Sequence, residues 1–240
     1  MMNYLREIRL NRPPNEAVYP FNIPAVRHLL KNGGLEFQKP VTFFVGENGT
    51  DKSTLIEAVA VAMGFNAEGG SRDHYFTTQR THSELCDYLI AAKTVAPQDG
   101  FFLRAESFYN TASYLEENGN LCRYGGISPH RQSHGESFLS LVTNRFGGNG
   151  LYILDEPESA LSPQRLMSLL VAVDTLVKND SQFIIATHSP ILMAYPNADI
   201  LQFTGQGIGR VAYKETEHYQ ITKQFIENPE RMMEYLLEKS

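Results

Sequence analysis

The sequence predicts an α/β protein in which a mainly parallel β-sheet is flanked by helices. Three short apolar runs, at 41–45, 151–154 and 183–186, have the composition of buried strands. Helical patterns at 52–65 and 162–179 lie between these runs. Buried strands that alternate with helices are typical of a parallel sheet covered on its faces. Since ligands bind at the carboxyl ends of such strands, the polar residues after each run are candidates for a site.

The first 40 residues are predicted to form short strands and loops, an antiparallel part that precedes the main sheet. Residues 4–10 alternate as in a strand, and four prolines within 11–26 argue against regular structure there. Residues 35–46 are predicted to form a hairpin that leads into the buried strand at 41–45.

A less regular stretch, 66–145, is predicted to be a small helical subregion of a single domain that spans 1–240. Within it we expect helices at 80–95 and 111–119 and a strand at 100–110. The chain contains no internal repeat, low-complexity linker or heptad run that would divide it.

The second half of the chain carries clearer patterns. A helix at 133–146 is expected to begin at Ser133, and the helix at 162–179 has a serine N-cap followed by proline. Residues 199–215 are predicted to form a hairpin around a glycine turn. The tail at 221–240 is expected to form one or two helices whose Met, Tyr and Leu side chains pack on the body, with a partner-binding helix as the alternative.

Composition excludes several classes of protein. Hydrophobic residues make up 42% of the chain and charged residues 20%, as in ordinary globular proteins, and no apolar run is long enough to span a membrane. The charged N-terminus does not resemble a secretory signal, so we expect a cytoplasmic protein without a membrane partner. A net charge of −6 does not support a broad nucleic-acid-binding surface. Cys86 and Cys122 fit no metal-binding spacing.

The segment GENGTDKST, residues 46–54, lies between a buried strand and a helix, as a phosphate-binding loop does. In such loops backbone N–H groups wrap a triphosphate, a lysine reaches its β- and γ-phosphates, and a serine hydroxyl holds Mg²⁺. The helix N-terminus adds favourable partial charge. The predicted nucleotide-binding residues of the loop are Gly46, Glu47, Asn48, Gly49, Thr50, Asp51, Lys52, Ser53 and Thr54.

Asp51 departs from this pattern, because a glycine normally precedes the lysine. A Cβ atom at this position would intrude on the phosphate, and a carboxylate would repel it. Two like charges about 4 Å apart cost roughly 4 kcal/mol at an effective dielectric constant of about 20, which weakens binding by roughly a thousandfold. We therefore expect this chain to bind ATP poorly or not at all.

Two acids, Asp155 and Glu156, end the apolar run at 151–154. The first acid at such a strand end can hold Mg²⁺, and the second can polarise the water that attacks a phosphate. The pair therefore predicts a metal ligand beside a catalytic carboxylate.

Further motifs lie at characteristic distances from Asp155. Ser133, in QSHGES, precedes it by 22 residues, His188, in IIATHSP, follows it by 33, and SALS at 159–162 comes just after the acids. In this order and spacing the motifs resemble those of the ATP-binding heads of ABC-type ATPases. The chain is most similar in style to the soluble SMC/RecF-like branch and its short single-domain AAA-type predicted ATPases. The resemblance covers nearly the whole chain and implies a P-loop NTPase fold.

The resemblance also implies roles for individual residues, with ATP as nucleotide and Mg²⁺ as metal. The loop at 46–54 would be the Walker A loop, and SALS would be the D-loop. The implied catalytic residues are Lys52, Glu156 and His188. The implied ligands of Mg²⁺ are Ser53, Asp155 and Gln79, the last as the candidate Q-loop glutamine.

A signature motif is implied at Ser133 and Gly135, where His134 departs from the family's first glycine and Gln132 from its usual leucine. In the family the signature helix of one subunit points its N-terminus at the γ-phosphate held by the other subunit. The resemblance thus implies an ATP-dependent head-to-tail homodimer, in which Ser133 contacts nucleotide across the interface.

The favoured function is a Mg²⁺-dependent ATPase whose hydrolysis resets a dimerisation switch, impaired here by Asp51. Only about 80 residues separate Ser53 from Ser133, which leaves no room for a coiled-coil arm. The alternatives are a non-catalytic interaction module of the same fold and, by analogy alone, a nucleic-acid repair or defence component. An unknown protein partner is compatible with each of them.

Overall fold

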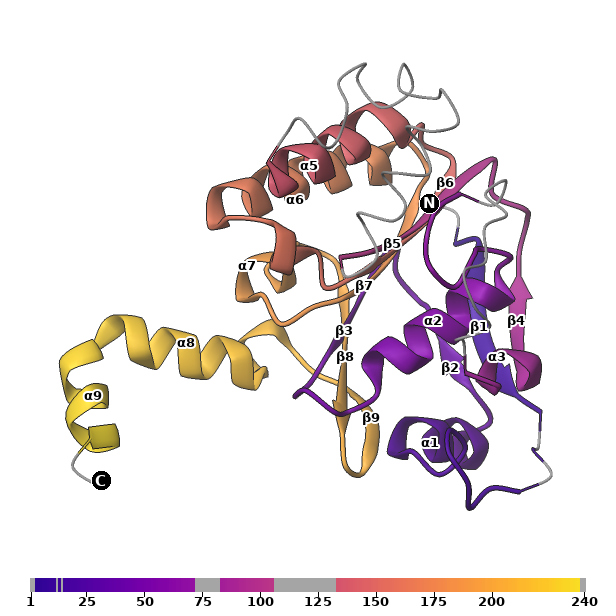
Figure 1. Cartoon of the computed structure of the whole chain (residues 1–240), viewed down its shortest axis with the longest axis horizontal. Helices are drawn as coiled ribbons and strands as arrows, with labels where there is room; N and C mark the ends of the chain where they lie inside the picture. The colour runs from indigo at the N-terminus through magenta and orange to yellow at the C-terminus, as the bar shows by residue number, and fades with distance from the viewer. Residues whose placement is uncertain (1–2, 12, 14, 72–82, 106–132, 238–240) are drawn as a thin grey trace.

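The computed structural model describes residues 3–11, 13, 15–71, 83–105 and 133–237 (Figure 1). The described strands form a six-stranded sheet and a three-stranded sheet. The strands of the large sheet, in spatial order, are β5 (Asp99–Arg104), β6 (Gly150–Asp155), β7 (Gln182–Ala186), β3 (Val41–Val45), β8 (Asp199–Thr204) and β9 (Gly207–Arg210). The strands of the small sheet, in spatial order, are β2 (Leu35–Glu36), β1 (Leu5–Leu10) and β4 (Leu89–Lys93).

Five strands of the large sheet are parallel, and β9 adds an antiparallel edge as the hairpin partner of β8. The three apolar runs of the sequence form β3, β6 and β7, and every residue of these strands is buried. The predicted α/β class, with a mainly parallel sheet, is therefore confirmed, as is the N-terminal antiparallel part.

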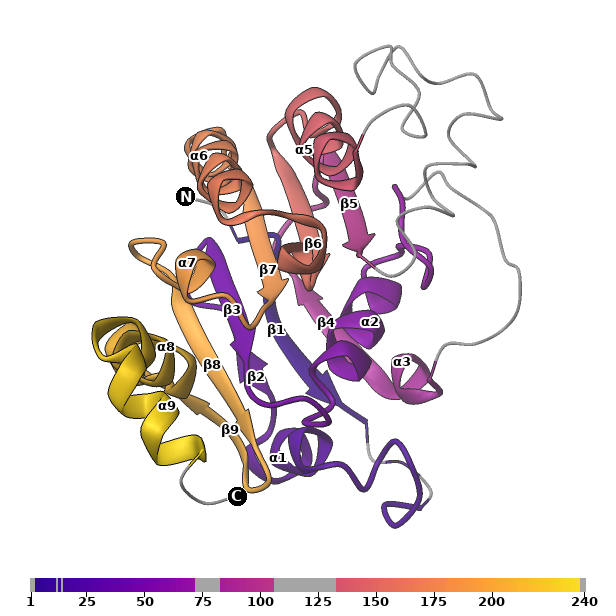
Figure 2. The ribbon, with the colours of Figure 1, turned by 60° about the vertical axis from the view of Figure 1, so that its left-hand side comes forward.

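Helices cover both faces of the large sheet (Figures 1 and 2). One face carries α1 (Pro24–Asn32) and α2 (Lys52–Ala62). The opposite face carries α5 (His134–Arg145), α6 (Pro163–Lys178) and α7 (Pro190–Met193). The alternation of side chains along each strand supplies both cores, since Phe44 packs with the first set of helices and Phe43 with the second.

The predicted hairpin at 35–46 is wrong. The short strand β2 pairs with β1 in the small sheet, whereas β3 belongs to the large sheet. The difference in burial explains this outcome: β3 is buried on both faces and suits a central parallel position, while Glu36 of β2 is exposed.

The absence of regular structure predicted for 11–26 is wrong at its end, where α1 begins. Pro24 is the first residue of this helix, a position at which the missing N–H costs no hydrogen bond. Gly33 ends the helix in the left-handed conformation, with φ of 79°.

The predicted helix at 80–95 is also largely wrong. Of the described residues in this range, those of α3 (Leu85–Tyr88) are helical, and the chain then continues as β4, which pairs antiparallel with β1. Pairing with an available strand edge outweighs the local helical preference here. The predicted strand at 100–110 is found as β5, whereas the predicted helix at 111–119 and the final residues of that strand lie outside the described residues.

The tail forms α8 (Glu217–Glu227) and α9 (Pro229–Leu237), which extend away from the sheet (Figure 1). The helices were expected, but the packing of their apolar side chains on the body was not borne out. Ile226 is 71% exposed and Leu237 is 63% exposed, and neither helix has a buried residue. Two 3₁₀ turns, Pro157–Ala160 and Tyr213–Glu215, complete the described elements.

Candidate functional site

Three loops with chemically reactive residues meet at the carboxyl edge of the large sheet. Strands β3 and β6 both neighbour β7, and Ala186 at the end of β7 is in register with Phe44 and with Asp155. The phosphate-loop segment therefore lies close to the acids after β6 and to the segment Thr187–Ser189 after β7. The topology brings together residues that are more than 100 positions apart in the chain.

Lys52 lies inside the curve of the loop. Its ammonium donates hydrogen bonds of 2.9 Å to the carbonyl oxygens of Gly46 and Glu47, and the residue is 4% exposed. Burial lowers the pKa of Lys52, opposed by the negative charges of the nearby acids at 156, 155 and 158. A buried ammonium among loop carbonyls can exchange these partners for phosphate oxygens.

Gly46 is required by close packing at the start of the loop. A Cβ atom at this position would lie 2.5 Å from the carbonyl oxygen of Phe203, and its φ of 149° is disfavoured for other residues. At Gly46 the loop can therefore present only backbone atoms to a ligand, as a phosphate-binding loop does.

Asp51 stands at the end of the loop in the left-handed conformation, with φ of 60° and ψ of 27°. It is the N-cap residue of α2, but its side chain accepts no capping hydrogen bond. Burial raises the pKa of its carboxyl group. The N-terminus of a helix favours negative charge. The carboxylate of Asp51 therefore stands where a negatively charged ligand would otherwise be favoured.

The predicted metal-binding pair is in contact. Ser53 Oγ donates a hydrogen bond of 3.2 Å to Asp155 Oδ1, and Asp155 is 6% exposed. A hydroxyl and a carboxylate in contact supply the oxygen ligands that Mg²⁺ prefers, so the donor set fits this ion. Gln79, the third predicted ligand, lies outside the described residues. Within the described ranges, no cluster of three or more His, Cys, Asp or Glu side chains suits a metal ion.

Arg104, at the end of β5, is a further residue of the site that sequence reasoning missed. Its guanidinium donates to Glu57 Oε2 and lies 3.6 Å from Asp155 Oδ2. The charge of Arg104 therefore balances the buried carboxylate of Asp155. No motif marks Arg104, because its position depends on β5 pairing in register with β6, where Arg104 is the partner of Asp155.

Glu156 and His188 face each other across the site. Glu156 has φ of 51°, a conformation that costs a non-glycine residue about 1–3 kcal/mol, so the fold holds this acid in a strained position. His188 Nε2 lies 3.5 Å from Glu156 Oε1, and His188 Nδ1 lies 3.0 Å from His218 Nε2. Burial and the charge of Lys52 lower the pKa of His188, while Glu156 acts in the opposite direction. Sequence reasoning missed His218, which belongs to α8.

Glu158 fixes the segment that carries His188. Its carboxylate accepts a hydrogen bond of 2.8 Å from Thr187 Oγ1 and another from the backbone N–H of His188. Burial raises the pKa of Glu158, and these donors act against that shift. Glu158 lies in the turn after Glu156, so one short segment controls both the acid and the histidine.

Ser133 and Gly135 stand at the start of α5, apart from the phosphate loop. Ser133 Oγ donates to Glu136 Oε2 at 2.7 Å and accepts from Arg165 Nη1 at 3.1 Å. A Cβ atom at Gly135 would lie 2.8 Å from the carbonyl oxygen of Ala160, so a glycine is needed where α5 meets the segment at 159–162. The structure thus gives Ser133 partners in α5 and α6, on the face of the sheet opposite α2 (Figure 2).

An exposed aromatic ring, that of Tyr19, lies beside the end of the loop. Its hydroxyl is 3.3 Å from Thr54 Oγ1, and the residue is 61% exposed. An accessible aromatic face near a phosphate site can stack on a nucleobase. Tyr19 comes from a segment in which the sequence predicted only loop, so no pattern singled it out.

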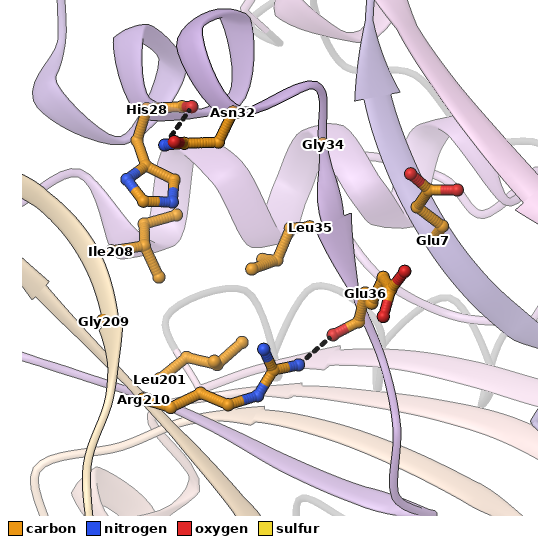
Figure 3. Close-up of a pocket in the computed structure, with 10 residues that line it drawn as sticks. All are labelled: Glu7, His28, Asn32, Gly34, Leu35, Glu36, Leu201, Ile208, Gly209 and Arg210. Carbon is orange, nitrogen blue, oxygen red and sulfur yellow. Dashed lines mark hydrogen bonds between the residues drawn. The ribbon is translucent and has the colours of Figure 1, made fainter.

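A pocket of about 260 Å³ lies between α1, β2 and the β8–β9 hairpin and is lined by none of these residues (Figure 3). Arg210 crosses it to donate a hydrogen bond of 2.7 Å to the carbonyl oxygen of Glu36, and His28 and Ile208 line its wall. It contains no residue of the predicted motifs. None of the described helices is both long and apolar enough to cross a membrane.

Comparison with known proteins agrees with the architecture. The family described as "AAA domain" matches residues 25–101, and the family described as "AAA domain, putative AbiEii toxin, Type IV TA system" matches residues 134–194. No curated protein matches the sequence.

Solved structures align along most of the chain. An inward-facing structure of a putative metal-chelate type ABC transporter aligns with a TM-score of 0.51 and 16% identity, over 92% of this chain and 88% of its own. The protein cbiO1 from Clostridium perfringens, part of the ABC transporter complex cbiONQ, aligns with a TM-score of 0.50 and 16% identity, over 98% and 99%. The SMC head domain from Thermotoga maritima aligns with a TM-score of 0.46 and 15% identity, over 87% and 98%, a likeness too low to support an argument. The first two alignments establish a shared fold, and their low identity carries nothing about activity.

Proposed function

We propose that this chain, which has the fold of an ABC-type ATP-binding domain, is a Mg²⁺-dependent ATPase acting as a dimerisation switch, and that Asp51 impairs its binding of ATP. The observation that carries the proposal is the convergence of Lys52, Asp155 and His188 on one edge of the sheet. Three independent motifs meet there, with a strained acid, Glu156, between them.

Each residue at this edge has a task that its surroundings support. Lys52 would bind the β- and γ-phosphates with the ammonium that now contacts loop carbonyls. Ser53 and Asp155 would hold Mg²⁺, which supplies charge neutralisation to the phosphates when bound. Glu156 would orient and polarise the attacking water, and His188 would donate a hydrogen bond to the terminal phosphate.

Asp51 acts against the first of these tasks. Its carboxylate lies at the N-terminus of α2, next to Lys52, so a phosphate would approach a like charge there. The raised pKa of Asp51 reflects burial of that carboxyl group, which reduces screening by water. Asp51 would therefore weaken the binding of ATP, whereas Asp155 and Glu156 at the end of β6 would keep their positions for catalysis.

The proposal is tested by comparing this chain with its Asp51→Gly variant. We expect calorimetric titration to give the variant an affinity for Mg²⁺–ATP roughly a thousandfold above that of the chain, and a malachite-green assay to detect phosphate release from the variant alone. A Lys52→Ala substitution in the variant, which removes the phosphate-binding ammonium, controls for contaminating ATPases. Micromolar affinity in the unaltered chain, without improvement in the variant, would overturn the proposed impairment.

A second candidate is a non-catalytic interaction module of the same fold. The exposed apolar side chains of α8 and α9 favour it, because such surfaces commonly bind partners. This alternative predicts that the Asp51→Gly variant releases no phosphate from ATP although it is folded. The malachite-green assay therefore separates the two candidates.

A further inference from the structure

The contact between His188 and His218 has a chemical consequence. A hydrogen bond between two imidazole nitrogens needs one N–H and one lone pair, so the 3.0 Å contact of His188 Nδ1 with His218 Nε2 permits two arrangements. Either His188 donates from Nδ1, or His218 donates from Nε2. The choice fixes which nitrogen of each neutral ring carries the proton.

The second contact of His188 decides between these arrangements. Its Nε2 is buried and faces Glu156 Oε1 at 3.5 Å, and a carboxylate can only accept hydrogen bonds. If His188 donated from Nδ1, the lone pair of Nε2 would face that negative charge. A proton on Nε2 removes the repulsion, and Nδ1 must then accept from His218.

The charges around the pair favour neutral rings. Burial lowers the pKa of both histidines, and Lys52 lowers both further. The carboxylates that act in the opposite direction are those of Glu156 on His188 and of Glu217 and Glu47 on His218. At neutral pH a neutral imidazole, with a definite tautomer, is therefore the relevant species for each ring.

We propose that His218 is a positioning residue whose Nε2–H donates a hydrogen bond to His188 Nδ1. This hydrogen bond keeps the proton of His188 on Nε2, where it faces Glu156. This inference rests on the proposed function, in which the Nε2–H of His188 is the donor to the terminal phosphate. The same tautomer that avoids repulsion by Glu156 is the one that can make this hydrogen bond.

The start of α8 holds His218 in place for this role. Thr216, the N-cap residue of this helix, is fully buried and its hydroxyl accepts from the backbone N–H of Tyr219. The rings of Tyr213 and Tyr219 pack with centroids 4.7 Å apart beside this turn. No residue within α8 is buried, so the buried N-cap Thr216 anchors the helix to the body at the end that carries His218.

The tautomer can be measured without nucleotide. We expect long-range ¹H–¹⁵N correlation spectra of the ¹⁵N-histidine-labelled chain at pH 7.5 to show His188 with a protonated Nε2 and an unprotonated Nδ1. The His188→Gln variant assigns the resonances among the seven histidines. The His218→Leu variant should shift Nδ1 of His188, which then loses its donor. A protonated Nδ1 in the unaltered chain, or unchanged His188 shifts in His218→Leu, overturns the inference.

Activity gives a second readout in the Asp51→Gly background. We expect His218→Leu to lower kcat about tenfold with KM for ATP nearly unchanged, as is typical when an orienting hydrogen bond is lost. His218→Gln, whose amide can donate from a similar position, should restore most of kcat. The matched control is Gln224→Leu, a polar-to-apolar change at an exposed site of the same helix.

The two proposals can fail separately. An inactive Asp51→Gly variant with the expected tautomer of His188 would refute the ATPase and leave the histidine pair intact. An active variant in which His218→Leu and His218→Gln lose kcat equally would refute the donor role of His218 and leave the ATPase intact.

Discussion

Asp51 differs in two ways from the glycine that normally precedes the lysine of a phosphate-binding loop. It brings a carboxylate, and it places a side chain on a backbone with φ of 60°, where glycine is the usual residue. Aspartate tolerates the left-handed conformation better than most residues, so the loop keeps its shape. The geometry of the loop therefore gives no reason for the proposed impairment, whereas the charge of Asp51 does.

Asparagine in place of Asp51 separates charge from shape. We expect Asp51→Asn to recover more than half of the gain in ATP binding free energy seen for Asp51→Gly, because it removes the carboxylate and retains a Cβ atom. Calorimetric titration at matched salt measures both. If the Asp51→Asn variant binds as weakly as the unaltered chain, steric intrusion rather than repulsion is responsible.

At the scale of elements, the half-buried carboxylate of Asp99 joins the end of α5 to the start of β5. Asp99 accepts hydrogen bonds from Arg145 Nη1 at 2.7 Å, from the Gly147 N–H at 2.9 Å and from Tyr152 Oη at 2.8 Å. Burial raises the pKa of Asp99, but these three donors outweigh it and lower the pKa overall. The carboxylate thus stabilises the layer formed by α5 on the sheet.

Asp99→Asn should reduce the free energy of unfolding by about 2 kcal/mol at pH 7, since it weakens hydrogen bonds to a charged acceptor. Because the folded pKa lies below the unfolded value, the stabilisation by Asp99 is present above the unfolded pKa and is lost as pH falls through the folded one. The difference in free energy of unfolding between the Asp99→Asn variant and the unaltered chain should therefore decrease in acid. Urea unfolding at pH 7 and below pH 4 measures it.

The control for this prediction is Glu227→Gln, which removes an exposed carboxylate paired with Lys223. We expect a change below about 0.5 kcal/mol. Equal losses for the two variants would show that Asp99 has no special role in joining α5 to β5.

Patterns of apolar residues predicted secondary structure well where the local sequence alone determined which element formed. The strands β3, β6 and β7 are mostly apolar and are buried throughout. A strand with two mostly apolar faces is stable mainly at the centre of a sheet that is covered on both sides. In contrast, Leu89–Lys93 became a strand because β1 offered an edge, which local sequence does not encode. Likewise the sequence does not predict α1, because proline breaks most helices, whereas Pro24 is the first residue of this one.

At the scale of the molecule, α2 and α5 lie on opposite faces of the sheet, and Ser133 has its partners in α5 and α6. A contact between Ser133 and a nucleotide on a phosphate loop is therefore most simply made by a second copy, as the resemblance implied. Glu136 and Arg165 position its hydroxyl at the exposed start of α5.

The dimer is tested with a variant that binds ATP without hydrolysing it. We expect Asp51→Gly with Glu156→Gln to elute with Mg²⁺–ATP at twice the mass of 27.0 kDa in light scattering at micromolar protein, because ATP then links two copies. Adding Ser133→Arg, which places a bulky cation at the proposed interface, should restore the monomer. A double variant that stays monomeric with ATP bound excludes the head-to-tail dimer.

The sequence by itself determined the parallel core of this protein and the residue types of its phosphate loop, because burial pattern and motif spacing are local properties of the chain. Only the tertiary structure decided that Arg104 balances Asp155 and that His218 contacts His188. These contacts arise from strand order and from the path of the tail, so their partners are far apart in the chain and belong to no common motif. The predicted roles of Glu156 and His188 thus follow from motifs in the sequence, whereas the contact between their side chains is seen only in the folded structure.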